Sequence, residues 1–345
     1  MRDSALMINR CAIRAFTACA IVFCAGCDED DISSLTAKRE TGLPPDSYEM
    51  ASLAAISYAS YEIKKTQARV ADLLEARGYS LIALLKGKET DTAGFAARKD
   101  DIVLVSFRGT ENLRNWFNNL KFLKVEFGNG KVHKGFYRGY TDLEDELNTV
   151  IDDAKRIVGS DRKFVLVGHS LGAALAQIFA LSLGKAGEEV STVYLYGSPR
   201  VGNACFVQEY NRIKNLGHRT FHFKNKGDPV TVVPKVRYYH TGKKVRLFDV
   251  ETGEFTIEDI EKSVCKKEEA EERLSLAARK QFDAEYREAL AVINGALQAG
   301  GSEILPEVMA EAKFARLELT YRHVIATYRR LIAVATLEQP YRASK

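Results

Sequence analysis

The chain of 345 residues is poor in histidine, cysteine and net charge, and these shortages exclude classes of function. Six histidines and six cysteines occur, and none of them has the spacing of a zinc site. The net charge of +4 is small, and no basic tract with interleaved aromatic residues accompanies it, so no nucleic-acid partner is predicted. With 46% hydrophobic and 28% charged residues, the chain is predicted to be a globular protein, and no metal or organic cofactor is implied.

The apolar run near the N-terminus, Ala15 to Gly26, is too short to span a membrane. Arginines precede it, and a basic stretch followed by a short apolar run is typical of a signal peptide. The run ends in Cys24-Ala25-Gly26-Cys27, which resembles the cleavage box of bacterial lipoproteins. We therefore predict a signal at residues 1–27 with lipidation, palmitate included, at Cys27. A plain secretory signal and an uncleaved anchor are the alternatives, and all three predict export.

The predicted anchor implies an exported protein held on a bacterial cell membrane, on its periplasmic or outer surface. Residues 28–45 are acidic and rich in turn formers, which predicts a tether. Only Cys205 and Cys265 follow the predicted signal. Their spacing does not decide between a disulfide and two free thiols.

Strand-like and helical patterns alternate over residues 46–257, which predicts an α/β core with a mostly parallel, doubly wound sheet. The unbroken β-branched run at 102–108 is typical of a strand buried on both faces. Strands are predicted at 94–99, 102–108, 163–167, 190–196, 220–223 and 243–248, and helices at 50–61, 68–77, 139–158, 171–183 and 204–213.

Residues 258–345 differ in character from this core. Charged helical patterns at 266–294 and 307–336 are separated by a break at 295–306. They predict a helical hairpin that packs on the core or offers a surface to a protein partner.

The pentapeptide Gly168-His169-Ser170-Leu171-Gly172 joins a short apolar run to an alanine-rich helical pattern. A nucleophilic serine on a sharp turn between a strand and a helix needs small residues on both sides, because chain and helix press together there. This setting predicts Ser170 as a catalytic nucleophile.

A serine nucleophile needs a histidine base and a carboxylate that orients it, and in this architecture they follow in the order Ser, acid, His. Asp228 comes directly after the strand predicted at 220–223, where α/β sites form. Two histidines remain as the base. His323 follows the last predicted strand, as this order requires, whereas His240 precedes it, so His323 is favoured and His240 stays open.

Two backbone N–H groups are candidates for stabilising an oxyanion. One belongs to Leu171, directly after the serine. The other belongs to Thr110, after the strand that ends in Arg108-Gly109.

The segment after Thr110 has apolar residues at helical spacing, which predicts either a mobile amphipathic lid over an apolar cleft or a core helix. The apolar positions include the single tryptophan of the chain. They are Leu113, Trp116, Phe117 and Leu120.

Several motifs together, in this order, resemble the class 3, fungal-type lipase family over about residues 51–248. This resemblance implies an α/β-hydrolase fold, Ser170 and Asp228 in a triad, Thr110 as the oxyanion residue and residues 112–122 as the lid. It also implies a base with a tyrosine five residues later, which His323 and Tyr328 match. The motifs are Phe107-Arg108-Gly109-Thr110, Arg114-Asn115-Trp116, Val132-His133-Lys134-Gly135-Phe136, Gly168-His169-Ser170-Leu171-Gly172, Tyr196-Gly197-Ser198-Pro199-Arg200, Asp228-Pro229-Val230 and Tyr239-His240-Thr241-Gly242.

These residues predict a serine hydrolase that cleaves acyl ester bonds of glycerides through an acyl-enzyme, with a lipid ester as substrate. Phospholipase A1-type cleavage of membrane phospholipids is the first alternative. A non-catalytic, membrane-anchored binding or assembly module on a hydrolase fold is an alternative of another class.

Overall fold

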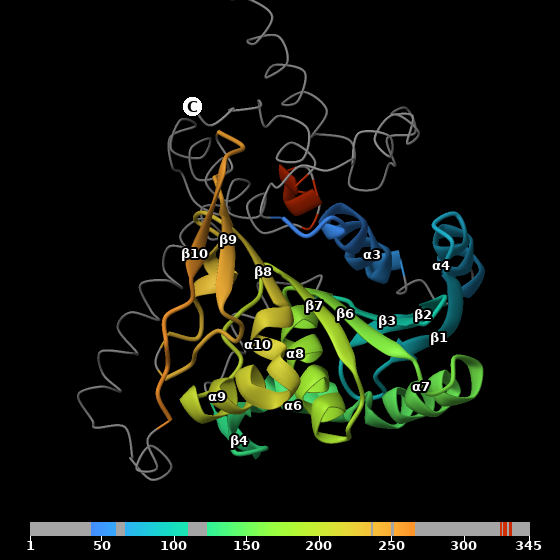
Figure 1. Ribbon diagram of the computed structural model, residues 1–345, viewed down its shortest axis with the longest axis horizontal. Helices are drawn as coiled ribbons and strands as arrows, with labels where there is room; N and C mark the ends of the chain where they lie inside the picture. The colour runs from blue at the N-terminus through green and yellow to red at the C-terminus, as the bar shows by residue number, and fades with distance from the viewer. Residues whose placement is uncertain are drawn as a thin grey trace, which may run out of the picture. The chain divides into compact units, whose positions relative to one another are not determined.

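The computed structural model describes residues 43–59, 66–109, 123–235, 237–249 and 252–265, together with 325, 327–329 and 331–332. An eight-stranded sheet runs through this part of the chain (Figure 1), in the order β1-β2-β3-β6-β7-β8-β9-β10. Its strands are β1 (Ser80–Lys86), β2 (Ala93–Lys99), β3 (Ile102–Phe107), β6 (Lys163–His169), β7 (Val190–Tyr196), β8 (Thr220–Asn225), β9 (Lys244–Phe248) and β10 (Phe255–Asp259).

The centre of the sheet is parallel, and both of its edges are antiparallel. Strands β3, β6, β7, β8 and β9 pair in parallel, with Phe107 opposite Gly168 and His169 opposite Tyr196. Strands β1 and β2 on one side and β10 on the other pair antiparallel. The carboxyl ends of the parallel strands therefore lie at one edge of the sheet, which positions the residues that follow them.

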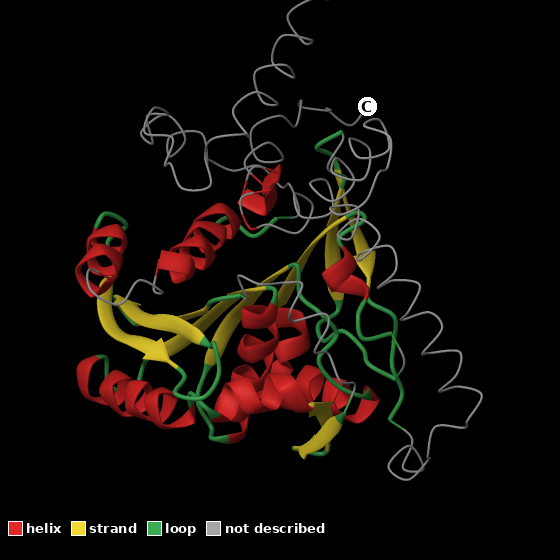
Figure 2. Cartoon of the chain, turned by 180° about the vertical axis from the view of Figure 1, so that it is seen from behind, coloured by secondary structure: helices red, strands yellow, loops and turns green. Residues whose placement is uncertain are grey.

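Helices cover both faces of the sheet, as Figure 2 shows from behind. On one face lie α3 (Ser47–Ala59) and α4 (Thr66–Glu75). Strand β3 faces two cores, because Val103 and Val105 join one hydrophobic cluster and Leu104 joins the other. The opposite face carries α6 (Lys134–Thr141), α7 (Glu144–Ile157), α8 (Leu171–Lys185), α9 (Ala204–Arg212) and α10 (Leu216–Arg219).

The predicted α/β class and mostly parallel sheet are confirmed, and two local predictions are corrected. The single helix predicted at 139–158 is two helices, α6 and α7, which are separated at Asp142 and Leu143. The Asp142 carboxylate accepts hydrogen bonds from the backbone N–H groups of Lys88, Glu89 and Thr90 and from the Thr90 hydroxyl. The Asp142 side chain thus binds the β1–β2 turn. The helix is interrupted at this tertiary contact, although the helical pattern of the sequence continues through it.

The sequence patterns also missed four strands, each of which pairs with a strand adjacent in the sequence. They are β1, β10 and the two strands of a separate hairpin, β4 (Lys124–Phe127) and β5 (Gly130–His133). Strand β10 extends the sheet to Asp259, and a disulfide joins Cys205 on α9 to Cys265 beyond that strand. Of the two alternatives left open by their spacing, these cysteines therefore form a disulfide. Most of the predicted C-terminal hairpin lies outside the described residues.

Candidate active site

Ser170 lies at the turn between β6 and α8, at the carboxyl edge of the sheet. Its φ of 57° and ψ of −123° are unusual for a residue with a side chain, so the turn is strained. Its N–H donates to the Tyr196 carbonyl at 3.0 Å, and its carbonyl accepts from the Ala173 N–H at 3.0 Å. These bonds hold the residue in a backbone conformation that it would not adopt on its own.

Glycines make this turn sterically feasible. A Cβ on Gly168 would lie 2.3 Å from the Gly172 carbonyl oxygen, and one on Gly172 would lie 2.1 Å from the Phe107 carbonyl oxygen. Neither distance is compatible with a side chain. The helix after the serine is therefore packed against the end of β3 at backbone contact distance.

The chain after β3 also approaches the serine closely. A Cβ on Gly109 would lie 3.1 Å from the Ser170 Cβ and 2.7 Å from the His169 carbonyl oxygen. The buried Arg108 side chain donates through Nη2 to the carbonyl and to the carboxylate of Asp91, at 2.7 and 2.8 Å. These contacts fix Arg108 and Gly109 beside Ser170.

The histidine before the serine, His169, is contacted by helix α3, which covers the opposite face of the sheet from α8. The Tyr58 hydroxyl on α3 lies 2.6 Å from His169 Nδ1, and the two rings are tilted at a centroid distance of 5.9 Å. Sequence analysis missed this contact, because a tyrosine more than a hundred residues upstream carries no local signal.

Asp228 lies just after β8 and is 2% exposed. One carboxylate oxygen, Oδ1, accepts from the Val230 N–H at 2.9 Å, and the Asp228 carbonyl accepts from the Thr231 hydroxyl at 2.9 Å. The residue N-caps the short 3₁₀ helix η4 (Pro229–Val232), so its carboxylate has a fixed direction.

Tyr328 brings the C-terminal part of the chain to this carboxylate. Its hydroxyl donates to Asp228 Oδ2 at 2.7 Å and accepts from the Asn225 N–H at 3.1 Å. Its ring lies 6.1 Å from the His169 ring and is fully buried. Burial next to the Asp228 charge raises the pKa of Tyr328 well above the ordinary value. The phenol stays protonated and donates to the carboxylate.

His240, the alternative base, lies in a different environment. Its Nε2 is 2.8 Å from the Thr231 carbonyl, and its Nδ1 is buried without a hydrogen-bond partner in the part of the chain that the structure describes. The ring packs T-shaped on His222 at 5.3 Å. Burial lowers the pKa of His240 well below its usual value and lowers the pKa of His222 to about 3. Neither nitrogen of His240 is bonded to Asp228.

The remaining predicted site residues lie outside the described residues. They are the oxyanion residue Thr110, the base His323, the lipidation residue Cys27 and the lid positions Leu113, Trp116, Phe117 and Leu120.

No helix in the described part of the chain is long and apolar enough to cross a membrane. No cluster of three or more histidines, cysteines or carboxylates that could hold a metal ion occurs there either.

The geometry thus places a strained serine and a buried, oriented carboxylate after strands β6 and β8, which are separated by β7 alone. Tyr328 lies between them: its ring packs on His169, directly before the serine, and its hydroxyl donates to Asp228. A serine on such a turn presents its hydroxyl at the sheet edge, where a histidine oriented by a carboxylate can remove its proton.

Comparisons with known proteins agree with this geometry. Residues 104–238 match the model of the family described as lipase (class 3). A lipase of Rhizomucor miehei is 33% identical over 189 residues, which are 51% of this chain and 51% of that protein. The secreted mono- and diacylglycerol lipase A of Penicillium cyclopium is 31% identical over 180 residues, 50% of this chain and 57% of that protein. The chain spans about half the length of the curated relatives it matches.

A solved triacylglycerol lipase, whose catalytic centre is described as a serine protease triad, superposes with a TM-score of 0.52. The superposition covers 64% of this chain and 88% of that one, at 26% identity. The fold is that of the α/β-hydrolases.

Proposed function

We propose that this chain, which is related to the class 3 lipases over residues 104–238, is a serine ester hydrolase acting on glycerides. The observation that carries the proposal is the strained Ser170 between β6 and α8, at the same sheet edge as the buried carboxylate of Asp228. A non-catalytic module would have no need of a serine in this conformation, because the strain stabilises nothing.

In the proposed reaction the Ser170 hydroxyl attacks the acyl carbonyl as its proton passes to His323. Asp228 orients the histidine and stabilises its cationic form. The protonated histidine then gives its proton to the departing alcohol oxygen. Water, deprotonated by the same histidine, attacks the acyl-enzyme and releases the fatty acid and the free serine.

The stabilisation of the oxyanion in each tetrahedral intermediate is assigned to the backbone N–H groups of Leu171 and Thr110. The close approach of Gly109 to Ser170 supports this assignment, because it brings the chain before Thr110 to the reacting oxygen. The apolar positions of residues 112–122 are assigned to a lid, which would turn its apolar side toward a lipid surface.

Two observations favour His323 over His240 as the base. His240 directs its Nε2 to the Thr231 carbonyl, so it cannot share the Asp228 carboxylate through that nitrogen. Tyr328, which stands five residues after His323 in the sequence, is bonded to Asp228, as the spacing of the base and the tyrosine in the resembling family leads one to expect.

Fluorophosphonate labelling tests the nucleophile. The full chain should be labelled at Ser170, and the Ser170→Ala variant should remain unlabelled. Ser191→Ala, on the neighbouring strand β7, is the matched control and should label like the wild type. An unlabelled wild type, or equal labelling of Ser170→Ala, would overturn the hydrolase and favour the non-catalytic binding module.

His323→Ala and His240→Asn test the base on a soluble short-chain p-nitrophenyl ester. Loss of turnover is expected in the first, and the second should retain turnover at neutral pH if it folds, as judged by its melting curve. The opposite result in a folded His240→Asn would assign the base to His240. A panel of glycerides and phosphatidylcholine then separates the glyceride lipase from phospholipase A1-type cleavage.

Export and lipid anchoring complete the proposal. The disulfide between Cys205 and Cys265 supports an oxidising compartment. Cys27→Ser should move the protein from the membrane fraction to the soluble fraction, and a variant that stays membrane-bound would contradict an anchor at this residue.

A further inference from the structure

A groove of about 860 Å³ lies at the opposite edge of the sheet from Ser170. Thr220 at the start of β8 and Lys244 at the start of β9 line it, whereas Ser170 and Asp228 follow the carboxyl ends of the parallel strands β6 and β8. The groove is therefore separate from the candidate active site.

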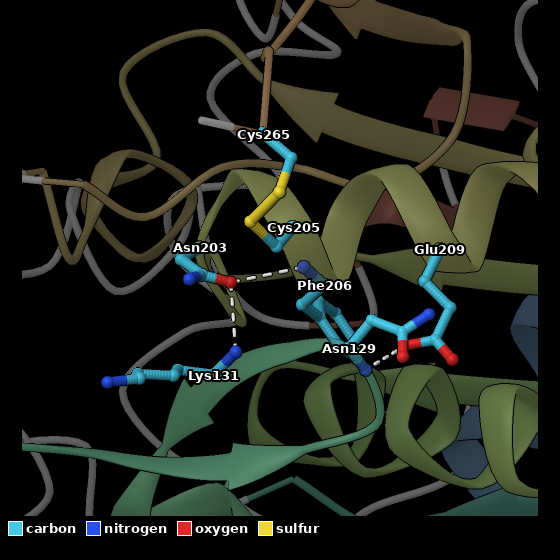
Figure 3. The surroundings of a disulfide bond; sticks show 7 residues. All are labelled: Asn129, Lys131, Asn203, Cys205, Phe206, Glu209 and Cys265. Carbon is cyan, nitrogen blue, oxygen red and sulfur yellow. Dashed lines mark hydrogen bonds between the residues drawn. A yellow bond between two sulfur atoms is a disulfide. The ribbon is translucent and has the colours of Figure 1, made fainter. Parts of the chain in front are cut away.

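The walls of this groove are held by covalent and backbone contacts. On one side runs α9. Asn203 caps this helix by accepting a hydrogen bond from the Phe206 N–H, and its side-chain oxygen also accepts from the Lys131 N–H of hairpin strand β5. On the other side runs the strap, residues 260–264. The Ile260 N–H donates to the Lys243 carbonyl at 2.8 Å at its start, and Cys265 is bonded to Cys205 of α9 just beyond its end (Figure 3). The strap is thus fastened at both ends.

The floor of the groove is equally well defined. Asn211 of α9 bonds both backbone groups of Gly242, accepting from its N–H at 2.7 Å and donating to its carbonyl at 3.3 Å. Gly242 has a φ of +84°, which suits glycine. The helix and the start of β9 are therefore held at a fixed separation.

The lining carries an excess of positive charge. Its carboxylates are Asp259, which is paired with Lys244 at 3.5 Å, and Glu261. Three exposed cations of the lining have no salt bridge within the described residues, and they come from the two walls and the floor. They are Arg212 on α9, Lys243 before β9 and Lys262 on the strap.

We propose that this groove binds a phosphate ester of headgroup size, such as a glycerophosphate. Arginine and lysine together recognise phosphate oxygens, arginine through paired N–H donors and lysine as a point charge. Cations on both walls and on the floor suit a group with several anionic oxygens.

Calorimetry with soluble glycerol 3-phosphate and sedimentation with phosphatidylglycerol vesicles test the proposal, against phosphatidylcholine vesicles as background. The full chain carries Cys27→Ser in both assays, so that lipid at residue 27 does not anchor it. The groove variant combines Arg212→Ala, Lys243→Ala and Lys262→Ala. A control variant with the same charge change, Lys155→Ala, Arg156→Ala and Lys163→Ala, alters exposed cations of α7 and β6 instead.

We expect the protein to bind in at least one assay. The affinity should fall at least about tenfold in the groove variant and less than about twofold in the control variant. Loss in the vesicle assay alone identifies a lipid headgroup, and loss with glycerol 3-phosphate identifies a soluble ester. Ser170→Ala should bind like the wild type, which separates this site from the proposed hydrolase. Absence of binding in both assays, or equal weakening in the two triple variants, would overturn the proposal.

Discussion

The two ends of the parallel strands are built in opposite ways. At the carboxyl end, backbone meets backbone around Ser170, and the polar groups are buried and bonded in fixed directions. At the amino end, the cations of the groove are exposed and project from separate elements. A reaction depends on the placement of a few atoms to within fractions of an ångström, whereas recognition of an anion depends on the sum of several charges. The two ends should therefore respond differently to mutation.

The largest contrast is expected from Asp228→Asn. The amide keeps an oxygen for the Val230 N–H, so the shape of the site is retained, but the negative charge that orients and stabilises a histidine cation is lost. Turnover of a soluble ester should fall about 10⁴-fold, measured as kcat, while glycerol 3-phosphate binding at the groove is unchanged. A loss of less than tenfold in turnover would contradict the assignment of Asp228 to the triad.

The next contrast compares two glycines of α8, because this helix begins at the serine and runs back toward the other edge. Gly172→Ala would place a methyl group 2.1 Å from the Phe107 carbonyl, which is part of the sheet and cannot move alone. We expect the free energy of unfolding to fall by about 3 kcal/mol or more, measured by urea denaturation.

Gly184→Ala is the matched control near the end of the same helix. The atoms nearest to its methyl group would be those of the Ile213 side chain, at 3.3 to 3.4 Å, and alanine is the better helix former. The free energy of unfolding should change by less than about 1 kcal/mol. Equal effects of the two substitutions would show that the carboxyl end is no more tightly packed than the rest of the helix.

These comparisons also explain what could be predicted from the sequence. The strand, turn and helix around Ser170 are specified by neighbouring residues, since the glycines and the apolar run lie within a few positions of the serine. The same is true of the turn at Asp228, where the proline sets the start of the 3₁₀ helix. Local sequence patterns were therefore sufficient to predict the turns at Ser170 and at Asp228.

Contacts between distant segments could not be predicted in this way. Tyr58 of α3 bonds His169 at the end of β6, Asp142 binds the β1–β2 turn, and Cys265 pairs with Cys205. The groove is formed by several elements that the fold brings together, among them α9, β8, β9 and the strap, and none of them has a distinctive pattern of its own. Sequence spacing carries no information on such pairs until the fold is known.

A pH experiment probes the interior between the two ends, where His222 and His240 are buried. Burial lowers the pKa of His222 to about 3, whereas the unfolded value is about 6.5. The unfolded chain therefore takes up a proton below about pH 6.5 that the folded chain refuses, so stability falls as the pH decreases from about 6.5 toward 3.

From this difference His222 alone should cost about 2 kcal/mol of stability between pH 7 and pH 5. The fall in melting temperature over that range should be smaller in His222→Asn than in the wild type. The exposed His218→Asn is the control and should keep the full pH dependence. Identical pH dependence in His222→Asn and the wild type would show that His222 does not set acid stability.

The smallest effect is expected from Tyr328→Phe, which removes one hydroxyl at the carboxyl end. Asp228 Oδ2 then loses a donor at 2.7 Å, but Oδ1 keeps the Val230 N–H, and the ring still fills its place against His169. One hydrogen bond to a charged group is worth about 1.5–3 kcal/mol at most, and the remaining contacts keep the carboxylate oriented. We expect kcat to fall about tenfold with KM nearly unchanged, since the phenol acts on the acid and not on the substrate. A change in KM with constant kcat would place Tyr328 in substrate binding, and the tight end of the sheet would then extend into the substrate site itself.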